Sequence, residues 1–105
     1  MSNWQLVELY EGLGDVYLLT KSYQSSIDAY NGGLKVAQKH LISPKVTDLN
    51  SKIAQSYNAK GETQKAEGFF NQSLKLANSQ NKQRAVEEKI KVADFQNEKN
   101  NYSGE

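Results

Sequence analysis

The 105-residue sequence contains no cysteine, one proline and one histidine. The absence of cysteine excludes a disulfide framework, a thiolate zinc site and a cysteine nucleophile. A single proline and only seven glycines argue against collagen-like, linker-like and turn-dense all-β architectures. Any imidazole chemistry would depend on His40, which stands beside Lys39 near an expected helix end, where it can complement the carbonyl dipole. We therefore expect no catalytic residue, no metal site and no cofactor.

Neither sign of charge predominates, because the sequence has 13 Lys and Arg residues and 12 Asp and Glu residues, for a net charge of +1. Such a balance creates no long-range field that would gather nucleic acid or an anionic membrane. The longest aliphatic and aromatic run is Val16–Leu19, far below the roughly 20 residues that span a bilayer. We expect a single cytoplasmic domain over residues 1–105, without nucleic-acid binding or membrane insertion. The alternative, a small basic patch for nucleic acid, would comprise Lys45, Lys52, Lys60, Lys65 and Lys75.

Apolar residues recur along the chain at steps of three and four residues, the spacing of one helix face. This periodicity predicts helices at about residues 4–19, 23–41, 43–60, 63–77 and 82–99, and no strand. Ser43 followed by Pro44 is typical of a capped helix start, and Gly61 is typical of a helix end. Polar breaks are expected at residues 78–81 and 100–101. The expected fold class is all-α with five helices.

The second pair of predicted helices repeats the first pair. A shift of 40 residues aligns large residues with large ones and small residues with small ones. The aligned pairs include Tyr17 with Tyr57, Leu34 with Leu74, Gly14 with Ala54, Ser26 with Ala66 and Gly33 with Ser73. A third, weaker copy begins about 39 residues later, where Val92–Ala93 takes the place of Ile53–Ala54. Recurring small residues are expected where two helices approach closely, so Gly14 and Gly33 are predicted packing positions.

The repeated unit has a recognisable motif. It reads Tyr10-x-x-Leu13-Gly14-x-x-Tyr17 with Ser26-x-x-x-Tyr30, then Asn50-x-x-Ile53-Ala54-x-x-Tyr57 with Ala66-x-x-x-Phe70. This motif resembles the tetratricopeptide repeat (TPR) family, and the period of about 40 residues resembles its long-repeat variants. The resemblance implies a TPR-like α-solenoid, a right-handed superhelical stack of antiparallel helix hairpins with about two and a half repeats. The repeats cover about residues 7–42 and 43–81, with 82–105 as a partial third repeat or a capping helix.

The resemblance further implies that the first helix of each repeat lines a concave groove that binds a peptide or a partner protein. Carried over by position, the groove residues are Glu8, Glu11, Asp15, Leu18, Asp48, Ser51, Gln55, Asn58, Glu87, Lys91, Asp94 and Glu98. Chaperone-binding members clamp a terminal carboxylate with Lys and Asn where this chain has Glu11 and Asp15. The acids predict an acidic groove and a neutral to basic partner.

The expected function is therefore a protein–protein interaction scaffold and not an enzyme. A regulatory or sensory module of a larger signalling protein, such as a sensor kinase, is the alternative that the resemblance leaves open. The third repeat lacks its second helix, so we also expect that the chain is a fragment of a longer array. Its open C-terminal end would then offer a surface for self-association.

Overall fold

The computed structural model describes residues 1–80 and 82–103, with side chains described for 1–79 and 83–98. Over these residues every regular element is a helix and there is no strand, as the periodicity predicts. The five helices are α1 (Asn3–Leu19), α2 (Tyr23–Lys39), α3 (Ser43–Lys60), α4 (Thr63–Gln80) and α5 (Lys82–Ser103).

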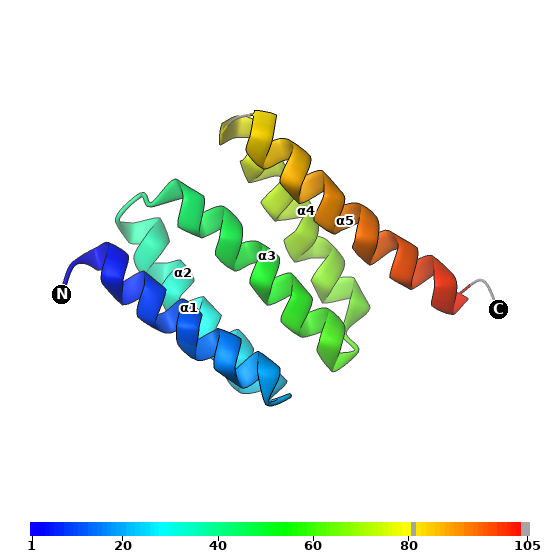
Figure 1. Cartoon of the computed structure of the whole chain (residues 1–105), viewed down its shortest axis with the longest axis horizontal. Coiled ribbons are helices and arrows are strands. Elements are labelled where there is room, and N and C mark those ends of the chain that lie inside the picture. Colours follow the sequence, from blue (N-terminus) through cyan, green and yellow to red (C-terminus); the bar gives the residue numbers. More distant parts are fainter. Residues whose placement is uncertain (81, 104–105) are drawn as a thin grey trace.

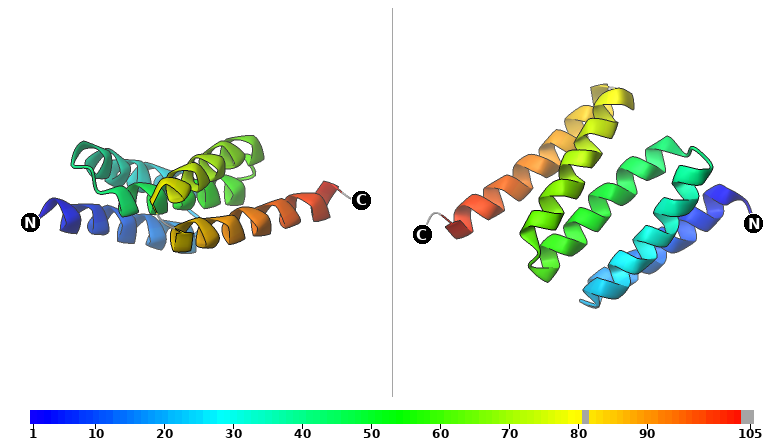
Figure 2. Two further views of the ribbon diagram at one scale, coloured as in Figure 1. Left: turned by 90° about the horizontal axis from the view of Figure 1, so that it is seen from above. Right: turned by 180° about the vertical axis from the view of Figure 1, so that it is seen from behind.

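The helices form two layers. Helices α1, α3 and α5 lie side by side and run in the same direction, with α2 and α4 behind them (Figure 1). Turning the molecule shows the two layers edge-on (Figure 2). Each helix packs on the next one in the sequence, and α1 also touches α3. This alternation is that of stacked helical hairpins, with α1 at one edge of the stack and α5 at the other.

Three inter-helix turns share one geometry, at positions spaced by 20 residues. Lys21, Leu41 and Gly61 all have left-handed backbones, with φ of 63°, 56° and 96°. In each turn the next backbone N–H donates to a carbonyl in the last helical turn, as in Ser22 to Tyr17 (2.8 Å). This pairing is that of the Schellman motif, which satisfies free helix carbonyls. The equal spacing keeps successive helices in register.

Several helix boundaries differ from those predicted. Helix α3 begins at Ser43 itself, so the predicted N-cap is its first residue, and Pro44 lies in its first turn. Helix α4 extends into the expected polar break as far as Gln80, and Asn81 lies outside the described residues. Helix α5 continues past Asn100–Asn101 to Ser103. Asn and Ser are only mildly unfavourable in a helix, so a short polar run of them does not by itself end one. The expected turn at the third copy is therefore absent.

The core lies between the layers in two clusters. One comprises Val7, Tyr30, Leu34, Ala37, Leu49 and Ile53. The other comprises Ala54, Ala66, Phe70 and Phe95. Small residues permit the close approaches, because a Cβ on Gly33 would lie 3.0 Å from the Cβ of Tyr10. The predicted packing role of Gly33 is thus confirmed, and that of Gly14, which lies against Tyr30, is confirmed likewise.

Part of the apolar face that the periodicity predicts for α1 is not buried in the structure. Leu9, Leu13 and Val16 are 60%, 45% and 56% exposed, and Leu19 is 83% exposed. They occupy the edge of the stack, where none of the helices among the described residues covers them. By contrast, Val7 on the face toward α2 is fully buried.

Candidate functional site

The interface between α1 and α3 is filled by ion pairs. Glu11 lies 2.8 Å from the Nζ of Lys45 and 3.3 Å from the Nζ of Lys52. Asp15 lies 3.0 Å from the same Lys52 nitrogen. The acidic groove expected on α1 is therefore wrong at these two residues, because α3 supplies a lysine to each of them.

Tyr30 extends this cluster toward the core. Its hydroxyl donates to Oδ1 of Asp15 at 2.5 Å. Burial and this hydrogen bond raise the pKa of Tyr30, because both favour the neutral phenol. For Lys52, burial lowers the pKa, but hydrogen bonding to Asp15 and the charges of Glu11 and Asp15 outweigh it, so that the pKa is raised. The cluster thus holds its charged lysine and its neutral tyrosine in place.

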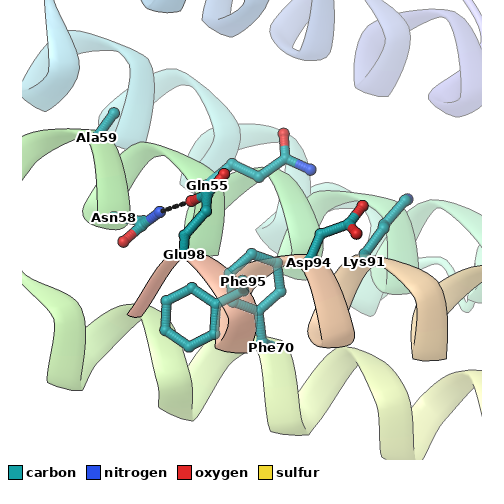
Figure 3. Close-up of a pocket in the computed structure, with 8 residues that line it drawn as sticks. All are labelled: Gln55, Asn58, Ala59, Phe70, Lys91, Asp94, Phe95 and Glu98. Atoms are coloured by element: carbon teal, nitrogen blue, oxygen red, sulfur yellow. Dashed lines mark hydrogen bonds between the residues drawn. The ribbon is translucent and has the colours of Figure 1, made fainter. Parts of the chain in front are cut away.

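The interface between α3 and α5 is bridged near both ends. Arg84 of α5 donates to Oδ1 of Asp48 at 2.7 Å and to the carbonyl of Pro44 at 2.9 Å. Toward the other end, Nδ2 of Asn58 donates to Oε2 of Glu98 at 3.2 Å (Figure 3). These contacts hold α5 parallel to α3.

A hollow of about 320 Å³ lies between α3 and α5, and we call it the α3–α5 hollow. Its lining residues are Gln55, Asn58, Ala59, Phe70, Lys91, Asp94, Phe95 and Glu98. Phe70 and Phe95 are each 3% exposed, and their ring centroids lie 4.7 Å apart, so they form an apolar base. The polar side chains of α3 and α5 stand around these rings (Figure 3). Backbone and side-chain groups of an extended segment could pair with this rim while its apolar side chains contact the rings.

The structure brings together one group of the predicted groove residues. Gln55 and Asn58 of α3 lie opposite Lys91, Asp94 and Glu98 of α5, and all five line the α3–α5 hollow. Ala59, Phe70 and Phe95 were not among the predicted site residues. The two phenylalanines stand at apolar positions of the helical periodicity, so their pattern indicated core only.

The other predicted groove residues lie elsewhere. Glu11, Asp15 and Asp48 are engaged in ion pairs between helices. Ser51 has no exposed surface, so its place in the groove is wrong: its side chain points into the packed interior. The remaining three lie outside the hollow, and they are the exposed Glu8 and Glu87 and the half-buried Leu18.

Glu88 is a buried acid, whereas the adjacent Glu87 and Lys89 are exposed. It is 1% exposed, and its Oε1 lies 3.1 Å from the Nζ of Lys91, one turn further along α5. Its Oε2 has no hydrogen-bond partner among the described residues. In the repeat alignment, Glu88 takes the place of Leu49, which is fully buried in the core. The position is therefore a core position that carries a carboxylate.

The lysines of the expected basic patch are largely neutralised. Lys45 and Lys52 pair with α1, as described above, and Lys60 and Lys65 lie 3.2 and 3.4 Å from carboxylate oxygens of Glu62. Lys75 is exposed on α4. Because of these ion pairs, the five lysines do not form a common surface of unneutralised positive charge.

Comparison of the chain with protein-family models, with curated proteins and with solved structures gave no match. Among the described residues, no helix combines the length and apolar character needed to cross a membrane. The two features of the chain that bear on its function are therefore the repeat motif and the α3–α5 hollow.

Proposed function

We propose that this chain is a protein-interaction scaffold of the TPR type, a right-handed stack of hairpins that binds a peptide or partner segment in the α3–α5 hollow. The observation that carries the proposal is the lining of this hollow. Two first helices of successive repeats, α3 and α5, contribute polar rims around an apolar base of Phe70 and Phe95. Recognition sites for extended peptides combine such a base with a few orienting polar groups.

The rim sets the chemistry of the partner. The amides of Gln55 and Asn58 can both donate and accept hydrogen bonds, which suits a peptide backbone. Asp94 and Glu98 stand with one cation, Lys91, which also pairs with the buried Glu88, so acids outnumber cations at the rim. A neutral to basic segment matches this balance.

The test is selection of peptides from a phage-displayed library of random linear peptides on the immobilised full chain. Enriched peptides are then titrated against the double variant Gln55→Ala/Asp94→Ala, which alters two exposed residues of the hollow. We expect affinity to fall at least about tenfold, the equivalent of ~1.4 kcal/mol.

A matched control exists on the opposite layer. Gln24→Ala/Asp28→Ala removes the same two residue types from the exposed surface of α2, and we expect unchanged affinity. Failure to enrich any peptide would contradict the proposal. So would enriched peptides that bind the hollow variant and the control variant equally well.

A further inference from the structure

A second apolar surface lies on the free edge of α1. We call it the α1 edge and define it by Leu9, Leu13 and Val16, which follow one another at helical spacing on the same face. All three are about half exposed or more. Contiguous apolar exposure of this kind marks an interaction site more often than scattered apolar residues do.

The chain itself shows what covers this face. A shift of 40 residues places Leu9, Leu13 and Val16 on Leu49, Ile53 and Ser56 of α3. These three residues have no exposed surface, and α2 covers them. Leu49 and Ile53 belong to one cluster with Tyr30, Leu34 and Ala37 of α2. The equivalent faces of α1 and α3 thus differ: the face on α3 is buried under the preceding helix, α2, and the face on α1 is exposed.

The covering helices carry a shared pattern. On α2 it is Ser26, Tyr30, Gly33 and Ala37, and on α4 it is Ala66, Phe70, Ser73 and Ala77. Both read small, aromatic, small, small, at steps of four, three and four. Within the pattern, Gly33 contacts both neighbouring first helices: a Cβ on it would lie 3.0 Å from Cβ of Tyr10 on α1 and 3.4 Å from Cδ1 of Leu49 on α3.

We propose that the α1 edge is a second docking site, which takes an amphipathic helix of a partner protein with this small–aromatic–small–small spacing. It packs across α1 as α2 packs across α3, and it is independent of the α3–α5 hollow. The driving force is burial of the three apolar side chains, each of which gains on leaving water.

A second copy of the chain does not supply such a helix. Its α2 and α4 patterns are already buried against α1, α3 and α5. Its other open apolar stripe, Val86 and Ile90 of α5, is 55% and 57% exposed. These positions align with Thr47 and Ser51, which lie on the same face of α3 as Ala54, a member of the core cluster with Ala66, Phe70 and Phe95. That stripe belongs to the first-helix type and lacks the required pattern.

The residue at position 16 makes the α1 edge selective among partner helices. The hydroxyl of Ser56 lies 3.0 Å from that of Ser26, so a polar pair joins α3 to α2. On α1 the corresponding residue is Val16, which offers no hydrogen bond. The Ser26 hydroxyl also donates to the carbonyl of Gly14 at 2.9 Å. A partner helix with alanine at the Ser26 position fits the α1 edge better than one with serine, whose hydroxyl would face the apolar Val16 in place of a second hydroxyl.

The probe is a fluorescein-labelled synthetic peptide of residues 22–42 that carries Ser26→Ala, titrated into the full chain by fluorescence anisotropy. We expect saturable binding, and weaker binding of the peptide that retains Ser26. The variant Leu9→Gln/Val16→Gln is expected to lower affinity at least about tenfold. It alters only exposed side chains on α1, so circular dichroism should report the wild-type fold.

Two controls make the outcome decisive. Val86→Gln/Ile90→Gln changes equally exposed apolar residues on α5 and should bind the peptide as the wild type does. Gln55→Ala/Asp94→Ala alters the α3–α5 hollow and should also leave peptide binding unchanged, which separates the two proposed sites. Peptide binding that survives Leu9→Gln/Val16→Gln would overturn the proposal, because the peptide would then be replacing α2 on α3. A dimer seen by light scattering that this variant converts to monomer would overturn it too, by assigning the α1 edge to a second copy.

Discussion

The ring of Tyr30 lies directly against Gly14, so that a Cβ at position 14 would come within 2.5 Å of Cδ1 of the tyrosine. Tyr30 itself has no exposed surface and is held by its hydrogen bond to Asp15. We therefore expect Gly14→Ala to force the ring or the helices apart. The expected loss is about 1–3 kcal/mol in the free energy of unfolding, measured by urea denaturation.

Gly12 is the matched control on the same helix. A Cβ there would meet nothing within 4 Å, and the position is exposed. Gly12→Ala should stabilise the chain by up to about 1 kcal/mol through helix propensity alone. If both variants shifted stability in the same direction, the packing of Tyr30 on Gly14 would not be the cause.

The left-handed backbone of the turn at Leu41 predicts that glycine at this position stabilises the chain. Leu41 has φ of 56° and an 84% exposed side chain, so it carries backbone strain without compensating burial. Leu41→Gly should relieve that strain and raise the free energy of unfolding by up to about 1 kcal/mol, because glycine enters this region without a Cβ clash. Thermal unfolding would measure the change.

Gly61 gives the reverse experiment in the equivalent turn. It already has φ of 96°, and a Cβ on it would meet no neighbouring atom. Gly61→Ala should lower stability by about 1–2 kcal/mol through backbone strain alone. A destabilised Leu41→Gly variant would show instead that the leucine side chain contributes to the turn.

Because the carboxylate of Glu88 is buried, we predict that removing its charge stabilises the folded chain. Its carboxylate is buried with one cation and one unpaired oxygen, and its counterpart in the second repeat is Leu49. Replacing a buried charge by an apolar residue of similar volume is often neutral or stabilising, by about 1–4 kcal/mol. We therefore expect Glu88→Leu to raise the midpoint of thermal unfolding.

Glu87 is the control, because it is the adjacent acid and is exposed. Glu87→Leu should change the unfolding free energy by no more than about 0.5 kcal/mol. A lower melting temperature for Glu88→Leu, with Glu87→Leu unchanged, would mean that the Glu88–Lys91 pair stabilises α5.

The Tyr30–Asp15 contact predicts a loss of stability at alkaline pH. The folded chain holds the phenol proton more tightly than the unfolded chain, in which tyrosine titrates near a pKa of about 10. This contribution is fully present below about pH 10 and is lost as pH rises further, because the unfolded state then releases the proton first. Lys52, whose pKa is also raised, acts in the same direction.

Tyr30→Phe isolates the tyrosine part of this dependence. Urea unfolding of both proteins between about pH 8 and 12 should show the wild-type curve falling more steeply, by up to about 1.4 kcal/mol per pH unit. The two curves therefore converge as pH rises. Curves that stay parallel would exclude ionisation of Tyr30 as the cause.

Much of the fold could be predicted from local pattern. The three- and four-residue spacing placed all five helices, and the 40-residue repeat identified Gly14 and Gly33 as close-packing positions. The resemblance to the TPR family put Gln55, Asn58, Lys91 and Asp94 into one predicted set, and these four line a single hollow in the structure. The helices and the close-packing positions follow from the sizes of the residues and their spacing along the chain, which the sequence alone determines.

Charge pairing and burial were decided by tertiary structure. Lys45 and Lys52 neutralise Glu11 and Asp15 across 34 to 37 residues of sequence, and no local pattern records that approach. Glu88 and Glu87 are adjacent acids, yet only one is buried. Leu9 and Leu49 occupy the same repeat position, yet α2 covers only Leu49. Periodicity defines the faces of a helix, but the exposure of each face depends on whether another helix packs there.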